Sequence, residues 1–176
     1  MIYNMEEIRL SDTVINEIKQ FVDQVERYLL NPAKVCYFEI DPKQLHEHQL
    51  KGFNGEQLNR VAKKSGVYAI WIKTATTTAP QYIGHTAGAT ARNRLINHFF
   101  KKHEKTGSQL ANVTKTVADG HSVGFTFVAL HPPLIRLYVE SELIARHHEL
   151  CIWNIQSKGP KGKSTIMAAY KDEQNV

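Results

Sequence analysis

The stretch Gly66-Val-Tyr-Ala-Ile-Trp-Ile72 is among the longest apolar runs in the chain. Its β-branched and aromatic residues, bounded by a glycine, predict a buried strand. A second short strand, Gln81-Tyr-Ile-Gly84, follows the polar segment Thr74 to Pro80, which we read as a loop. The two strands therefore predict a hairpin whose connection is seven residues or slightly longer.

The residues that follow this hairpin predict two helices and a further strand. Small residues from Gly84 to Thr90 predict a loop, and Thr90 is placed to cap a helix from Ala91 to about His103. Leu95, Ile96, Phe99 and Phe100 form the apolar side of that helix. Ser122 to His131 reads as a third strand, ended by Pro132-Pro133, and Arg136 to about Leu150 reads as a helix with Asn154 just beyond it.

The ends of the chain differ in character from its middle. Ser11 to Leu30 shows helical spacing of apolar residues, with Ser11 or Asp12 as the cap, and Asn31-Pro32 ends the helix. A short strand at Val35–Ile40 and a helix over residues 41–50 follow. We interpret residues 1–50 as an accessory helical arm that grips DNA, forms a dimer or completes the core. Residues 157–176 predict a basic, flexible tail, because lysines there alternate with Gly, Pro and Ser.

These elements predict an α/β (α+β) fold. A small central sheet, antiparallel or mixed, would contain three core strands flanked by helices. The principal domain would span residues 51–156, with the N-terminal helical arm before it.

Composition narrows the class of protein. The chain has 176 residues, of which 42% are hydrophobic and 22% charged, as expected for a single globular domain. No apolar run is long enough to cross a bilayer, and Glu6 and Glu7 do not fit a secretory signal. Cys36 and Cys151 do not suggest a disulfide framework, so we expect a cytoplasmic protein that makes no membrane contact.

Positive charge is concentrated in the middle of the chain. Residues 51–114 contain 10 Lys or Arg against 2 Asp or Glu, a net +8, whereas the whole chain carries +5. A local basic surface suits a polyanionic partner, because binding phosphates releases counterions. A solvated lysine surface is the alternative, and charge alone separates the two only weakly.

Several polar side chains are candidates for chemistry, although each has an ordinary structural explanation. Two tyrosines lie on the hairpin beside glycines, where they could simply pack. An arginine and a histidine four residues apart share one helix face, which is common on solvated surfaces. A glutamate that opens a helical stretch, Glu-Ser-Glu-Leu-Ile, could merely stabilise the helix dipole. The candidates are Tyr68, Tyr82, Arg94, His98, Glu140 and Asn154.

In this order and spacing, the candidates resemble the GIY-YIG nuclease family. The resemblance covers about residues 65–155 and rests on Gly66-Val-Tyr68, Tyr82-Ile-Gly84, Arg94 and His98, Glu140-x-x-Leu-Ile144 and Asn154. It is similar to the restriction-endonuclease branch in having His98 one turn after Arg94. The resemblance implies an endonuclease that cuts double-stranded DNA with Mg²⁺ or Mn²⁺.

Two assignments stay open between neighbouring residues. The separation from Glu140 to Asn154 is longer than in the repair branch of the family, and Glu142 would shorten it. We favour Glu140 because it keeps the Glu-x-x-Leu-Ile pattern. Arg92 is the alternative to Arg94, which we favour because it faces His98.

The resemblance implies a role for each group. Tyr68 would act as general base, although a phenol with a pKa of about 10 needs nearby positive charge to do so. Arg94 would stabilise the scissile phosphate. Glu140 would be the metal ligand, since Mg²⁺ can be held by one carboxylate and its own waters. Tyr82 would position water or phosphate, His98 would assist Tyr68, and Asn154 would shape the site.

Several residues allow other interpretations. His85 could donate to a phosphate or be an exposed loop histidine. His147, His148 and Cys151 suggest zinc only weakly, since a fourth ligand pattern is missing. A non-catalytic nucleic-acid-binding module is the main alternative function. Cleavage of both DNA strands with one site per chain would require two copies, which is the reason for expecting a homodimer.

Overall fold

The computed structural model of the chain describes residues 9–41, 47–50, 52–101 and 108–157. The strands are β1 (Cys36–Tyr37), β2 (Gly66–Lys73), β3 (Thr78–Thr86) and β4 (Ser122–Ala129). The helices are α1 (Asp12–Leu29), α2 (Phe53–Val61), α3 (Ala91–Phe99), α4 (Leu110–Ala118), α5 (Arg136–Arg146) and α6 (Ile152–Ser157). Short 3₁₀ turns lie at η1 (Pro32–Lys34), η2 (Glu47–Leu50), η3 (Gly88–Thr90) and η4 (Pro133–Ile135).

The strands form one antiparallel sheet in the order β1-β4-β2-β3. This confirms the expected α+β class, with the two-residue β1 added to the three core strands. The strand expected at Val35–Ile40 is reduced to β1, which pairs only with Gly124 and Phe125 of β4. Strand β2 is central and pairs along its whole length with β3 and β4.

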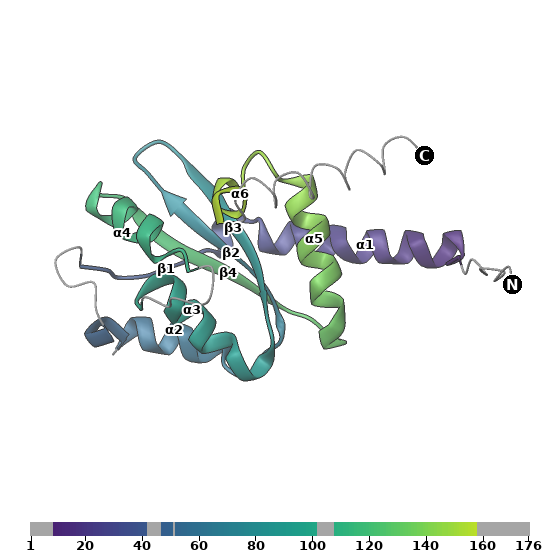
Figure 1. Cartoon of the computed structure of the whole chain (residues 1–176), viewed down its shortest axis with the longest axis horizontal. Helices are drawn as coiled ribbons and strands as arrows, with labels where there is room; N and C mark the ends of the chain where they lie inside the picture. Colours follow the sequence, from purple (N-terminus) through teal and green to yellow (C-terminus); the bar gives the residue numbers. More distant parts are fainter. Residues whose placement is uncertain (1–8, 42–46, 51, 102–107, 158–176) are drawn as a thin grey trace, which may run out of the picture.

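The continuous apolar run of β2 reflects burial on both faces of the sheet. Val67, Ala69 and Trp71 face one core, which α1 and α5 complete. Tyr68 and Ile70 face the other core, which is filled from α2, α3 and α4. Figure 1 shows α1 and α5 away from α2 and α3, with the sheet between the two pairs.

Helix α1 contributes directly to one of these cores. Ser11 caps it by accepting a hydrogen bond from the backbone N–H of Val14, and Val22, Val25 and Leu29 are buried. Arg146 of α5 bonds Asp23 and Glu26 of α1, at 2.6 and 2.8 Å, which ties the two helices together. The N-terminal segment therefore completes the core, one of the three roles expected for it.

Several sequence-based boundaries were wrong. The segment Thr74 to Pro80 is not all loop, because β3 begins at Thr78 and the connection is only residues 74–77. Edge strand β3 accommodates Pro80, since a missing N–H is tolerated at an edge. Thr90 occupies the cap position of α3 without a capping hydrogen bond, because its hydroxyl bonds the carbonyl of Ala87 instead.

Other helices differ in extent from the prediction. Within residues 41–50 the structure describes only the turn η2, and residues 42–46 lie outside the described part. Helices α2 and α4 were not predicted, and α3 and α5 end earlier than expected, at Phe99 and Arg146. The predicted tail lies outside the described residues, apart from Ser157 at the end of α6. In the described part, no helix has both the length and the apolar character needed to cross a membrane.

Candidate active site

The β2–β3 hairpin brings the two tyrosines together on one face of the sheet. Tyr68 pairs with Gly84, and Tyr82 pairs with Ile70, so Tyr68, Tyr82 and Gly84 share that face. A Cβ atom at Gly84 would lie 2.6 Å from the phenol oxygen of Tyr68 and 2.7 Å from the Tyr82 ring. Glycine is therefore required here by the close approach of both rings, whose centroids are 6.1 Å apart.

Helix α3 places Arg94 and His98 over these phenols. The Nε atom of Arg94 donates to the Tyr68 oxygen at 3.2 Å, and Nε2 of His98 lies 2.7 Å from the same oxygen. The Tyr82 hydroxyl is hydrogen bonded to Arg94 and to Tyr68. Because Arg94 and His98 are four residues apart on one helix, both side chains can contact the same Tyr68 oxygen.

The hydrogen bonds of His98 fix its tautomer. The backbone N–H of Gln109 donates to Nδ1 at 3.2 Å, so Nδ1 is an acceptor. Burial, together with the charge of Arg94, lowers the His98 pKa to about 3, so the ring is neutral. A neutral imidazole with an accepting Nδ1 carries its proton on Nε2. His98 therefore donates to Tyr68, and the phenol oxygen accepts from two donors.

Burial sets the protonation of the two phenols in the free protein. It raises the pKa of Tyr68 well above its ordinary value, and the neighbouring Tyr82 and Glu140 raise it further. Arg94 acts in the opposite direction, through its charge and its hydrogen bond. The pKa of Tyr82 is raised by burial in the same way. Both phenols are therefore protonated at neutral pH, and use of Tyr68 as a base requires additional positive charge.

Glu140 on α5 is the acidic residue whose charge acts on this cluster, although its partner His85 alternates with Tyr82 and Gly84 along β3 and so faces the opposite side of the sheet. Glu140 lies within α5 rather than at its start, and its charge raises the pKa of both tyrosines. Its Oε2 atom lies 2.5 Å from Nδ1 of His85 on β3, and no described residue bonds its Oε1 atom. His85 was expected only as a phosphate donor or a loop residue, so its contact with Glu140 was missed.

The geometry separates the paired alternatives. Glu142 bonds Nε of Arg146 at 2.9 Å, within the ion pairs that join α5 to α1. Arg92 donates from Nε to the side chain of Asn59 at 2.9 Å, on the exposed side of α3. Glu140 and Arg94, by contrast, are the members of each pair that interact with the tyrosines.

Asn154 supports the site through the backbone of β3. It is the third residue of α6, a helix that was not predicted, and is buried. Its Oδ1 accepts from the Ile83 N–H at 2.8 Å, and its Nδ2 donates to the Ile83 carbonyl at 2.7 Å. Both contacts hold the strand segment between Tyr82 and Gly84, so Asn154 orients the hairpin.

A metal ion at this site would have few protein ligands. In the described part of the chain, no three His, Cys, Asp or Glu side chains converge on one point. Glu140 nevertheless offers a free carboxylate oxygen, which is the donor type that Mg²⁺ prefers. The weak zinc alternative gains no support, because His147 bonds Glu26 and Cys151 is buried in the core.

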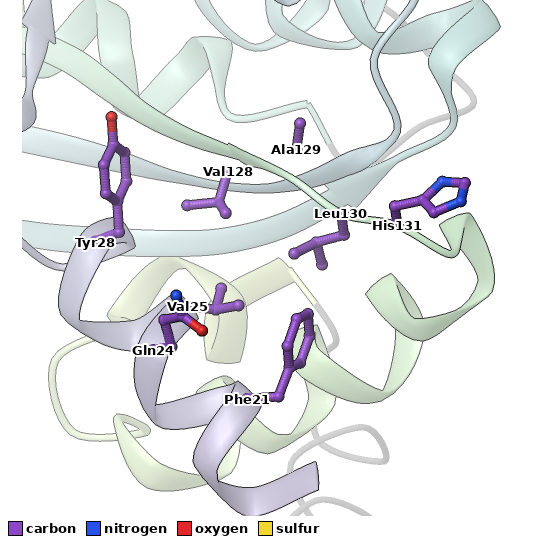
Figure 2. A pocket seen from close by; sticks show the side chains of 8 residues that line it. All are labelled: Phe21, Gln24, Val25, Tyr28, Val128, Ala129, Leu130 and His131. Atoms are coloured by element: carbon purple, nitrogen blue, oxygen red, sulfur yellow. The ribbon is translucent and has the colours of Figure 1, made fainter. Parts of the chain in front are cut away.

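A separate apolar hollow of about 240 Å³ lies between α1 and the end of β4. Figure 2 shows Phe21, Val25 and Tyr28 of α1 facing Val128 and Leu130 across it. None of the residues of the tyrosine cluster lines this hollow. The hollow is therefore separate from the tyrosine cluster.

Comparison of the chain with protein-family models, curated proteins and solved structures finds no match.

Proposed function

We propose that the protein is a divalent-metal-dependent endonuclease that hydrolyses phosphodiester bonds in double-stranded DNA. The observation that carries this proposal is the Tyr68 oxygen, which accepts hydrogen bonds from Arg94 and His98 and whose pKa is raised by the charge of Glu140. The cluster combines a potential base, a fixed positive charge and an acidic ligand. These are the groups that phosphodiester hydrolysis needs. The resemblance to GIY-YIG nucleases supports the same reaction.

Arg94 would bind the scissile phosphate. It is partly buried, and it is hydrogen bonded to Tyr68 through Nε and also to Tyr82, but a guanidinium has five N–H donors, so others remain to donate to phosphate oxygens. A fixed donor at this position stabilises the charge that develops in the transition state, and its loss costs on the order of 100-fold or more in rate.

Tyr68 would remove the proton from the attacking water. Its oxygen accepts two hydrogen bonds, and donors to a phenol oxygen favour the phenolate over the phenol. Its own proton would pass to Tyr82, to which it is hydrogen bonded, while Tyr82 releases its hydroxyl proton to solvent water. His98 acts as a positioning residue, because its low pKa keeps it a neutral donor throughout the working pH range.

Glu140 would hold a Mg²⁺ or Mn²⁺ ion through its free oxygen, with most ligands supplied by water. The bound ion would supply Lewis acidity and positive charge beside the phenols. His85 would orient the carboxylate by bonding its other oxygen, as hydrogen-bonding partners of metal ligands commonly do. The free thiols Cys36 and Cys151 fit the reducing cytoplasm that we propose as the location.

Supercoiled plasmid separates this proposal from its alternatives. The wild type should nick or linearise the plasmid with Mg²⁺, and it should fail with chelator or with Glu140→Ala. Salt-sensitive binding without cutting under any of these conditions would replace the enzyme with a nucleic-acid-binding module. If the protein neither binds nor cuts DNA, the tyrosine cluster serves only to pack the core.

We further propose that two copies act together, since one site per chain must cut two strands. Analytical ultracentrifugation with and without a DNA duplex tests this. A dimer on DNA is expected, and a monomer in both conditions would remove this part of the proposal.

A further inference from the structure

A groove lies at the free edge of β4, away from the tyrosine cluster. It has a volume of about 260 Å³ and is bordered by α2, β4 and the turn η1. Strand β1 pairs only with Gly124 and Phe125, so the next residues of β4, Thr126 and Phe127, line the groove beyond the end of that pairing. We call it the α2–β4 groove and define it by Lys34, Gln57, Arg60 and Lys64.

The charged side chains lining the α2–β4 groove are all basic. Lys34, Arg60 and Lys64 border it, and no Asp or Glu does. No residue of the described part forms an ion pair with any of these three cations. Three like charges around one depression repel one another, and an anion in the groove relieves that repulsion.

A buried amide provides a second, independent observation. Gln57 is 6% exposed and lines the groove. Its side chain makes no hydrogen bond with any residue that the structure describes, and its amide atoms are not fully buried, so they reach solvent at the groove. An amide that has no partner and reaches solvent at a cationic groove is suited to donate to a bound oxygen. Phosphate oxygens accept such bonds and match the surrounding charge.

The surroundings favour a long polyanion over a small one. Lys63 and Lys64 are both exposed at the end of α2. Arg92 on α3 bonds Asn59 of α2, which joins this basic region to the helix that carries Arg94. Figure 1 shows α2 and α3 side by side on the same side of the sheet. A charged backbone could contact the groove and the tyrosine site at the same time.

We propose that the α2–β4 groove binds a backbone phosphate of double-stranded DNA at a distance from the scissile bond. This inference rests on the proposed function for the identity of its ligand. It assigns Arg60 and Lys64 to phosphate contacts and Gln57 to a hydrogen bond with the same phosphate. Contacts of this kind position the duplex and carry no sequence information.

Salt dependence of binding tests the groove directly. Affinity for a fluorescent duplex is measured over a range of salt concentrations in the presence of chelator, which prevents cutting. Each neutralised phosphate contributes about 0.9 to the slope of log K against log salt, so Arg60→Gln with Lys64→Gln, which removes both cations from one phosphate, should reduce the slope by about 0.9. Lys19→Gln with Lys115→Gln, which removes two exposed lysines elsewhere, should leave it unchanged.

A nearly isosteric variant gives a second readout. Gln57→Glu places a carboxylate next to Arg60 and Lys64, where it should compete with the phosphate and weaken duplex binding. Thermal melts verify that each variant folds. An unchanged slope for the double groove variant, or a change equal to that of the lysine control, would overturn the proposal. Preference of the groove for RNA over DNA, shown by a slope change with RNA duplex only, would overturn it as well.

Failure of the groove and failure of the enzyme give different results. In one outcome, the wild type binds the duplex, the groove variants show a smaller salt-dependence slope, and no DNA is cut. That outcome supports the groove proposal and rejects the endonuclease proposal. In the other outcome, DNA is cut but the groove variants keep the wild-type salt-dependence slope. That outcome supports the endonuclease proposal and rejects the groove proposal.

Discussion

The Nε2 atom of His98 lies 2.7 Å from the phenol oxygen of Tyr68, and the backbone N–H of Gln109 holds the other nitrogen of the ring. The two contacts fix the tautomer of the neutral His98 ring, with its proton on Nε2. The buried ring thus connects the N-terminal end of α4 to the centre of the tyrosine cluster.

His98 should make the folded state sensitive to acid. Its pKa is lowered to about 3 in the fold but is about 6.5 in an unfolded chain, so only the unfolded chain gains a proton between these values. Stability contributed by the neutral ring is complete above pH 6.5 and is lost as pH falls toward 3, by about 1.4 kcal/mol per pH unit. The stability difference between wild type and His98→Asn, from urea unfolding, should therefore shrink below pH 6.5. A difference that is constant from pH 7 to 4 would contradict this.

Two substitutions separate the two contacts of His98. Asn keeps an acceptor near Nδ1 for Gln109, whereas Gln keeps a donor near Nε2 for Tyr68. If the donor matters for the reaction, His98→Gln should cleave DNA faster than His98→Asn, by about tenfold for one hydrogen bond. Equal rates for the two variants would reduce His98 to packing.

Gly84→Ala should damage the site more than it damages the fold. The added methyl would lie 2.6 Å from the Tyr68 oxygen, so the phenols must shift, at a stability cost of about 1–3 kcal/mol. Cleavage should fall at least tenfold. Gly120→Ala is the control. Its φ of +80° strains an alanine, but the added methyl would have no atom within 4 Å. This variant should therefore lose stability while keeping activity. Equal activity for both variants at matched stability would show that the phenols need not stay in place.

Arg94 and Arg92 form a matched pair of substitutions. Arg94→Lys removes the donor to Tyr68 and the fork that would bind phosphate, so plasmid cleavage should fall about 100-fold. Arg92→Lys removes one exposed bond to Asn59 and should stay near the wild-type rate. A larger loss from Arg92→Lys than from Arg94→Lys would transfer the phosphate-binding role to Arg92.

His85 should affect metal dependence more than maximal rate. His85→Ala removes the partner of one Glu140 oxygen and should raise the Mg²⁺ concentration for half-maximal cleavage roughly tenfold. His85→Asn, whose amide nitrogen can replace Nδ1, should recover much of that loss. Identical Mg²⁺ dependence in all three proteins would remove His85 from the metal site.

Regular periodicity made part of the fold predictable. Strand β2 and the cores of α1, α3, β4 and α5 follow from apolar spacing in the sequence. Helix α2 was missed because its buried positions include polar and small residues. Asn54 is buried because its amide bonds both backbone groups of Glu39. Gly55 is required because a Cβ there would lie 2.2 Å from the carbonyl oxygen of Leu50. Neither fact is visible before the chain is folded.

The candidate site was predictable in its membership but not in its connections. Glycines beside two tyrosines and the helical spacing of Arg94 and His98 indicated which side chains could meet. The bond from Gln109 to His98 and the contact of His85 with Glu140 join residues distant in sequence, and no local pattern marks them. The alternatives Glu142 and Arg92 could be separated from Glu140 and Arg94 only by their tertiary partners.

The most direct measurement is the rate of Mg²⁺-dependent plasmid cleavage by Glu140→Gln compared with Glu142→Gln. Both variants remove one negative charge from the same helix, but the charge of Glu140 acts on the tyrosines, whereas Glu142 pairs with Arg146. We predict that Glu140→Gln abolishes cleavage and that Glu142→Gln retains it with a slightly lower melting temperature. Full cleavage by Glu140→Gln would contradict the proposed site.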